Sequence, residues 1–365
     1  MRKKLQSLFV AAMLCATAAN ANEPVTATVV AYNPAPGQFI NALPKFEEGK
    51  DSVSMAALAN EKIAAKSMIS LGAFGGNVVF KLSSPIQNVK DEYDFSIFGN
   101  SFEGSSEPGI VSVSVDANNN GLADDTWYEL EGAAWDSVGV IKEYTITYYK
   151  PTAEMDAAKG NHEEYIQWKD NQGAEGWVPK NGYHIQSYYP LWYGDSITFT
   201  GTKLPNNCYD KSGNGSFWVL PGYEWGYVDN RPNADVNKNS FKIDHARNAE
   251  GELANLTHID FIKVHNGMYA INGHLGEAST EVQEIKIISP KAIIASIEQE
   301  KVTNKYYINS ENIIFENAIN SATIYEISGR TVRNIAETSN TIDISNLNNG
   351  IYILRTENET IKFIK

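Results

Sequence analysis

Ten residues at positions 116–125, DANNNGLADD, place oxygen-bearing side chains at alternate positions of a short loop. Gly121 sits where such a loop needs a sharp turn, because glycine adopts backbone conformations that other residues avoid. Calcium binds about six to eight hard oxygen ligands in a flexible geometry. The segment therefore predicts a structural calcium loop, whose ligands are the side chains of Asp116, Asn118, Asn120 and Asp124 and the main-chain carbonyl of Leu122.

This loop departs from the helix-flanked calcium-binding pattern in two ways. Its twelfth position is Trp127 where that pattern has a glutamate, and the flanking segments VSVSV and TWYEL predict strands. A metal-free hairpin turn is the alternative, since Asn and Gly favour it as well. Glu103, Glu107 and Asp125 are candidates for completing the coordination shell. A weaker pattern lies at 229–239, where Asp235, Asn237 and Asn239 alternate without the glycine. It predicts either a second metal site or a solvated polar loop.

Aromatic residues are concentrated between positions 177 and 227, many of them beside Gly and Pro. Aromatic side chains in loops offer flat apolar area with a polar edge, which suits stacking on sugar rings or on a large planar ligand. The alternative is that these residues fill the core and fix long loops. The predicted ligand-binding residues are Trp192, Tyr193, Trp218, Tyr223 and Trp225.

Motifs of known catalytic mechanisms are absent from the sequence. There is no G-x-S-x-G, H-E-x-x-H, P-loop or dinucleotide-binding fingerprint, and the six histidines lack metal-ligand spacing. Carboxylates are abundant, so a glycosidase-like pair stays open, although no spacing singles one out. The sequence favours a binding protein over an enzyme.

Most of the chain has the period-two alternation of strands. Residues 110–115, IVSVSV, predict a strand with valines on a buried face and serines on an open one. A helix is predicted for 51–71, from its Ala, Met, Leu, Glu and Lys content. We expect an all-β fold, a calcium-stabilised β-sandwich or jelly roll. The other predicted strands are 77–82, 93–98, 144–148, 196–200, 217–220, 259–264 and 282–288.

Both the ends of the chain and its charge bear on location. A basic start, a short apolar run and Ala19-Asn20-Ala21 predict a signal peptide at 1–21, and no later segment is long and apolar enough for a transmembrane anchor. Leu14 before Cys15 argues against lipid attachment. The formal net charge of −14 argues against binding nucleic acid. The protein is therefore expected to be exported.

The end of the chain has a distinct pattern of short strands. IYEISGR, NTIDISNL and GIYIL follow one another before a last strand that contains lysine. This order resembles the C-terminal sorting domain of the type IX secretion system of Bacteroidetes, a small β-sandwich. The resemblance covers residues 296–365 and implies that the secretion machinery is a partner and that the protein reaches the cell surface or the medium. An ordinary accessory β domain is the alternative.

Three segments of residues 22–290 carry a second resemblance. LGAFGGNVVF at 71–80, YDFSIFGNSF at 93–102 with EPGIVSVSVD at 107–116, and IDFIKVH at 259–265 with NGHLGE at 272–277 resemble secreted cell-surface proteins of Bacteroidetes. These proteins recur beside outer-membrane transporters, including those for vitamin B12. The resemblance implies a surface protein that binds a ligand, with a corrinoid (vitamin B12) as the first candidate, and passes it to such a transporter. A glycan-binding module or glycan-active enzyme is the second hypothesis, and an adhesin or structural surface protein is the third.

Overall fold

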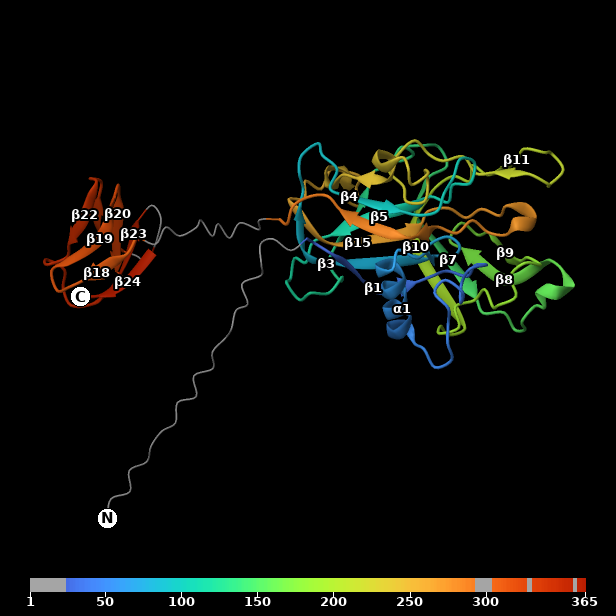
Figure 1. Cartoon of the computed structure of the whole chain (residues 1–365), viewed down its shortest axis with the longest axis horizontal. Helices are drawn as coiled ribbons and strands as arrows, with labels where there is room; N and C mark the ends of the chain where they lie inside the picture. Colours follow the sequence, from blue (N-terminus) through green and yellow to red (C-terminus); the bar gives the residue numbers. More distant parts are fainter. Residues whose placement is uncertain (1–23, 293–303, 327–329, 357–359) are drawn as a thin grey trace, which may run out of the picture. The chain divides into compact units, whose positions relative to one another are not determined.

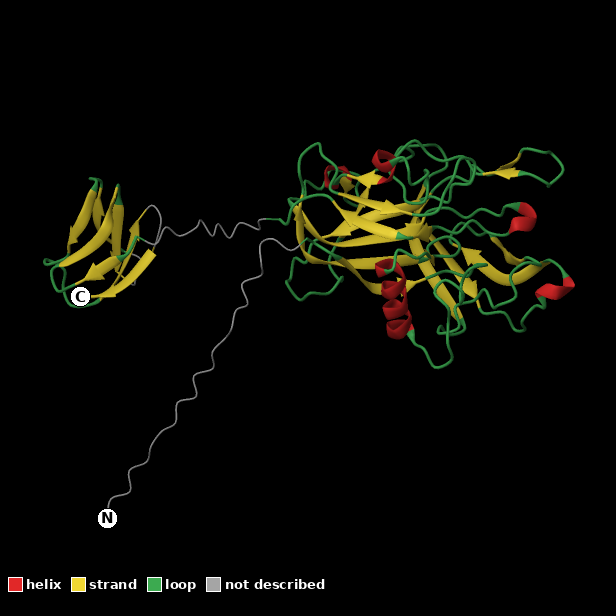
Figure 2. Ribbon diagram, in the orientation of Figure 1, coloured by secondary structure: helices red, strands yellow, loops and turns green. Residues whose placement is uncertain are grey.

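The computed structural model describes residues 24–292, 304–326, 330–356 and 360–365. The chain forms two compact units, Met1–Ala292 and Ile293–Lys365, here called the main unit and the C-terminal unit (Figure 1). The signal peptide predicted at 1–21 lies outside the described residues. The described residues are mostly strand in both units, which confirms the all-β prediction (Figure 2).

A six-stranded antiparallel sheet, here called the main sheet, is the centre of the main unit. Alternate residues on one face are apolar and fully buried, among them Val78, Phe80, Val111 and Ile262. Burying each such side chain stabilises the fold by about 1.5–3 kcal/mol. In spatial order the strands are β1 (Ala27–Asn33), β3 (Asn77–Gln87), β15 (His258–Asn266), β5 (Gly109–Ser114), β6 (Trp127–Leu130) and β14 (Ala246–Arg247).

A second layer packs against this apolar face and closes the core. It contains the helix α1 (Ser52–Ala64), which contributes Met55, Ala59 and Ile63, and two small sheets that contribute Phe95, Ile97 and other side chains. The small sheets consist of β13 (Ser240–Phe241), β4 (Phe95–Phe98) and β17 (Glu284–Ile287), and of β2 (Ile69–Ser70) and β16 (Glu281–Val282).

The helix is shorter than the predicted 51–71. Asp51 caps its start, because the carboxylate accepts a 2.8 Å hydrogen bond from Ser54 N–H. The helix ends at Ala64, and Lys66 has a φ of 53°, which takes the chain out of helical geometry. Ile69 then enters β2, because its side chain is buried in the sandwich core.

A four-stranded antiparallel sheet builds a second core in the main unit. Tyr144, Ile146 and Tyr148 alternate with more exposed residues along one strand, as the sequence predicts. Its strands, in spatial order, are β10 (Ser196–Lys203), β7 (Ile141–Tyr149), β8 (His162–Asp170) and β9 (Glu175–Lys180). The remaining elements of the main unit are β11 (Tyr209–Asp210), β12 (Trp218–Val219) and the 3-10 turns η1 (Ala157–Lys159), η2 (Val236–Asn239), η3 (Ile243–His245) and η4 (Gly273–Leu275).

The C-terminal unit has its own core between two sheets. Ile313, Ile324, Leu354 and Phe363 are among its buried side chains. One sheet has the order β18 (Tyr306–Ile308), β19 (Asn312–Ile319) and β22 (Ser339–Asp343). The other has the order β21 (Thr331–Ile335), β20 (Ala322–Glu326), β23 (Ile351–Thr356) and β24 (Thr360–Ile364).

One detail of the predicted strand at 110–115 is wrong. The serine face of β5 is not open, because Ser112 and Ser114 are buried as well as the valines, with only 5% and 0% of their surface exposed. The second face of the main sheet is therefore covered by other parts of the main unit, and that covered polar face holds the candidate site.

Candidate functional site

A row of polar residues crosses the second face of the main sheet. Lys263 of β15 is directly opposite Ser112 of β5, and Ser112 is opposite Glu129 of β6. Glu129 is in turn opposite Arg247 of β14. Cross-strand partners have their Cβ atoms only about 5 Å apart, so these four side chains form one contiguous polar strip.

A cavity of about 410 Å³ lies over this strip, and we call it the Lys263 groove. Its floor is the strip together with His265 of β15 and Asn77 of the neighbouring strand β3. The walls are formed by the following residues: Trp127, Trp135, Lys142, Glu143, Thr200–Thr202 and Asn248–Gly251.

The carboxylate of Glu129 is held from two sides. Its Oε1 accepts a 3.0 Å hydrogen bond from Lys142 Nζ, and its Oε2 accepts a 2.6 Å hydrogen bond from Thr202 Oγ1. Lys142 Nζ also lies 3.1 Å from the centroid of the Trp135 ring. These contacts fix an acid, a base and an aromatic face in one wall of the groove.

Lys263 differs from the other bases of the groove because its ammonium has no hydrogen-bond or ion-pair partner among the described residues. Its Nζ lies 4.5 Å from the centroid of the Trp127 ring. Burial lowers the pKa of Lys263 to about 8. An unpaired, largely buried cation that faces a cavity is suited to binding an anionic or strongly polar group of a ligand.

His265 lies beside Lys263 and is neutral at ordinary pH. Burial lowers its pKa to about 4, and Nε2 lies 3.2 Å from the carbonyl of Thr202. Nε2–H therefore donates to that carbonyl. The histidine holds β15 to β10 at the inner end of the groove.

The predicted calcium loop forms a rim next to this groove. A second cavity of about 380 Å³ shares Trp127 and Lys263 with the Lys263 groove and is bordered by Gly121, Leu122 and Ala123. Lys81 Nζ donates a 2.6 Å hydrogen bond to Gly121 O and so fixes the loop to β3. The loop therefore lies where an ion bound in it would set the position of the rim.

The oxygens of the loop are engaged in hydrogen bonds within it. Asp116 accepts from the N–H groups of Asn120 and Gly121 at 3.0 and 2.8 Å, and the Asn118 side chain accepts from Asn120 N–H at 2.9 Å. Asn120 Nδ2 donates to Asp124 at 3.0 Å. The donor set is all oxygen, as calcium requires, but the Asn120 amide must rotate before its oxygen and Asp124 can share an ion.

The five predicted ligand-binding aromatics do not gather on one surface. Trp192 stacks between Tyr32 and Phe46, with ring centroids 6.1 and 5.9 Å away, and packs against the sandwich core. Tyr193 packs against the second core. These two positions have structural contacts that account for them.

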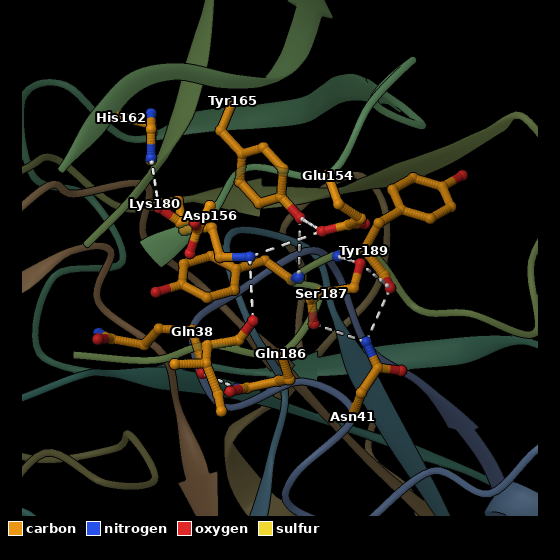
Figure 3. Close-up of polar contacts among 12 residues, drawn as sticks. Gln38, Asn41, Glu154, Asp156, His162, Tyr165, Lys180, Gln186, Ser187 and Tyr189 are labelled. Carbon is orange, nitrogen blue, oxygen red and sulfur yellow. Dashed lines mark hydrogen bonds and ion pairs between the residues drawn. The ribbon is translucent and has the colours of Figure 1, made fainter. Parts of the chain in front are cut away.

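Polar contacts hold the segment that precedes Trp192 in place (Figure 3). Asn41 Nδ2 donates to the carbonyls of Ser187 and Tyr189 at 2.7 and 2.8 Å, and Gln186 Nε2 donates to Gln38 O at 2.5 Å. Lys180 is buried nearby and donates to Ile185 O at 3.3 Å. Tyr188 and Tyr189 are fully buried, so much of the aromatic density here belongs to the core.

The other three aromatics are also separated from one another. Trp218 donates from Nε1 to Gly215 O at 3.2 Å, and Tyr223 donates to Pro205 O at 2.9 Å. Trp225 lines a cavity of about 430 Å³ with Tyr93, Phe241 and His245. Of the five, Trp225 thus keeps a surface on which a ligand could stack.

The second pattern at 229–239 forms η2 and the turn before it. Asn239 is buried, and its amide donates to the carbonyls of Pro232 and Asp235 at 3.0 and 3.1 Å. Asp229 is also buried, far from solvent. The metal site proposed from Asp235, Asn237 and Asn239 stays a prediction.

Sequence reasoning missed the groove, although a signal for it was present. Lys263 and His265 are polar residues that alternate with the apolar Ile262 and Val264 in β15, and Trp127 and Glu129 lie at alternate positions of β6. Such alternation marks a polar sheet face. It does not show that four strands bring those residues together.

Comparison with known proteins identifies the end of the chain. Residues 302–365 match the secretion system C-terminal sorting domain, and a search of curated proteins found no match to the chain. Among the described residues, no helix is long and apolar enough to cross a membrane. The protein is an exported, all-β protein whose type IX sorting domain directs it to the cell surface or the medium through the secretion machinery.

Proposed function

We propose that this protein is a non-enzymatic binding protein that captures a small ligand in the Lys263 groove at the cell surface. The single observation behind the proposal is the partly buried ammonium of Lys263, which has no hydrogen-bond or ion-pair partner among the described residues and lies near Trp127 and Glu129. Leaving a cation desolvated and unpaired costs stability, so a polar ligand that pairs with it would offset that cost.

The groove favours a ligand with a flat face and a polar rim. Trp127 and Trp135 supply flat apolar area, while Ser112, Asn77 and Thr200 supply hydrogen-bonding groups. A corrinoid has a large flattened ring with amides around it and, in cobalamin, a phosphodiester that would pair with Lys263. The resemblance to surface proteins beside vitamin B12 transporters supports the same ligand, with an outer-membrane transporter as the partner that receives it.

A glycan is the second candidate ligand, because the rings of Trp127 and Trp135 would also stack on sugars. In this case Lys263 would select an acidic sugar. Turnover of a glycan would change the assignment to an enzyme, and binding to a surface polymer without a small ligand would indicate an adhesin.

The direct test is calorimetry and tryptophan fluorescence of the full mature chain with cyanocobalamin and with neutral and acidic glycans. Lys263→Met keeps the aliphatic stem and removes the charge, and Trp127→Ala removes the stacking face. We expect each variant to weaken binding by about tenfold or more, the loss typical of a central contact. Unchanged affinity in both variants would remove the groove as the site.

A matched variant separates the groove from the site predicted from the aromatic sequence pattern. Trp225→Ala removes an aromatic face from the cavity beside His245 and leaves the groove untouched. If Trp225→Ala abolishes binding while Lys263→Met does not, the ligand sits with the sequence-predicted aromatics. If the protein binds neither cobalamin nor any of the glycans, the adhesin hypothesis is the one that remains.

We also propose that the loop at 116–125 binds calcium and thereby stabilises the rim of the groove. The all-oxygen donor set of Asp116, Asn118, Asn120, Asp124 and Leu122 O supports this assignment. The ion would act on structure, with no part in chemistry, because the loop borders the cavity only through Gly121, Leu122 and Ala123.

A further inference from the structure

Three carboxylates meet inside the main unit, away from the Lys263 groove. They are Glu107, Asp229 and Glu281, and one oxygen from each lies within 4.8 Å of the others. Glu281 belongs to β16, in the second layer of the sandwich, whereas Glu107 precedes β5 of the main sheet. The cluster therefore joins the two layers. We call it the buried carboxylate cluster.

The cluster lacks a compensating positive charge. None of the ion pairs formed by the described residues includes Glu107, Asp229 or Glu281. Burial raises the pKa of Glu107 to about 8 and that of Asp229 to about 7, and it raises the pKa of Glu281 well above its ordinary value. Three like charges in a low-dielectric site repel one another, so the cluster must take up protons or a cation.

Hydrogen bonds satisfy only part of the cluster. Asp229 accepts from the N–H groups of Asn100, Ser101 and Glu281 at 2.7, 2.8 and 2.9 Å. Glu107 Oε1 accepts from Ser279 N–H at 3.0 Å. In contrast, Oε1 of Glu281 has no partner in the described part of the chain, although Glu281 is only 2% exposed. The same is true of Ser101 Oγ, in a residue 8% exposed.

Asn100 borders the cluster and hydrogen-bonds to two of its acids. Its side-chain NH2 group donates to Oδ1 of Asp229 at 3.2 Å and to Oε2 of Glu281 at 3.3 Å. Rotation of the amide by half a turn would present its oxygen to the same place. The amide can therefore serve protonated acids with its nitrogen or a bound ion with its oxygen, and it does not decide between them.

We propose that the buried carboxylate cluster binds one calcium ion, with Glu107, Asp229 and Glu281 as ligands and with the Asn100 oxygen joining them once its amide rotates. Two oxygens bound to one calcium at about 2.4 Å can be up to about 4.8 Å apart. The three carboxylate oxygens lie within 4.8 Å of one another, so one ion can reach all three. All the donors are hard oxygens. Magnesium fits less well, because it usually keeps several waters, for which a buried site leaves little room.

The ion would lock the two layers of the sandwich together. Through Glu107, Asp229 and Glu281 it would bridge the segment before β5, the loop between β12 and η2, and strand β16. An exported protein without an internal disulfide has few other cross-links, since its one described cysteine, Cys208, is free. This site is separate from the loop at 116–125, and each can be removed alone.

The test measures bound calcium and thermal unfolding of the full mature chain after chelation and after return of calcium alone or magnesium alone. Glu281→Gln and Glu107→Gln keep the shape of the side chain and remove one charge each. We expect each variant to bind one calcium ion fewer per chain than the parent. The affinity of the site should fall at least about tenfold, because removing even an outer-sphere partner of a metal costs about that much. Asp116→Ala is the matched control, since it affects only the loop.

The outcomes separate an ion from shared protons. If the cluster is held by protons, Glu281→Gln will unfold at the same temperature as the parent or higher, and its response to calcium will equal that of the parent. That result overturns the proposal. The proposal is also overturned if the Asp116→Ala substitution alone removes all the calcium that the parent protein binds. If Glu281→Gln does not fold, Glu107→Gln decides by the same two measurements.

Discussion

Lys263 of β15 lies directly opposite Ser112 of β5. Ser112 is buried and Lys263 is partly buried, whereas residues on a solvent-facing side of a sheet would be exposed. The pair occupies the face of the main sheet opposite the apolar core. Because other segments cover this face, the polar residues on it are partly desolvated. Burial of the lysine outweighs the favourable charge of the nearby Glu129, so Lys263 is a binding feature that also carries a stability cost. The first prediction measures that cost.

Replacing Lys263 by Met should stabilise the unliganded protein at neutral pH. Burial lowers the pKa of Lys263 to about 8, from an ordinary value of 10.5. The folded state therefore disfavours the charged form, and the full penalty is present below pH 8, where both folded and unfolded chains carry the proton. This difference corresponds to about 3 kcal/mol.

The advantage of Lys263→Met should disappear as pH rises. Between pH 8 and 10.5 the folded protein loses the proton while the unfolded chain keeps it, so the penalty on the parent is relieved. Urea unfolding of both proteins at pH 7 and pH 10 checks this. A variant less stable than the parent at pH 7 would show that Lys263 has a stabilising partner in solution.

Trp192 and Trp127 should separate stability from binding. Trp192 is partly buried and stacks on Tyr32 and Phe46 against the core, so Trp192→Ala should lower the free energy of unfolding by about 3 kcal/mol, the lower end of the range for large aromatic residues. Trp127→Ala lies at the groove and should mainly weaken ligand binding. Denaturant unfolding and ligand titration are measured on both variants. If a folded Trp192→Phe variant loses most of its ligand binding, Trp192 is part of the ligand site after all.

The loop at 116–125 predicts a calcium-dependent difference in stability. Asp116→Ala removes a proposed ligand and also the acceptor of the Asn120 and Gly121 N–H groups. We expect a small decrease in melting temperature without calcium and a clearly larger one with calcium. Melting curves with and without chelator measure both. Equal decreases in the two conditions would refute an ion in this loop.

Deletion of residues 302–365 should stop surface delivery without unfolding the main unit. The deleted residues match the sorting domain, and the main unit has separate cores. Fractionation and surface labelling of cells should find the shortened protein on the inner side of the outer membrane and not at the cell surface. Its purified form should melt at the temperature of the parent's main transition. Surface labelling equal to that of the parent would contradict the sorting role.

Several features could be predicted from the sequence because they depend on local pattern. Period-two alternation located β5, β7 and β15, and the order of short strands at the end of the chain located the sorting domain. The helix was located too, but its end was not, because Ile69 is drawn into β2 by a tertiary core. Composition likewise pointed to aromatic residues without distinguishing Trp192, which packs against the core, from Trp127, which lines the groove.

By itself, the sequence determined that the protein is exported and built from strands. Sorting signals and period-two alternation depend only on residues close together in the chain. Only the tertiary structure decided where ligands and ions would be held. Lys263 and Glu129 are 134 positions apart and share a row because β5 pairs with both of their strands. Glu107, Asp229 and Glu281 converge for the same reason, as no local pattern records which distant carboxylates a sandwich will bury together.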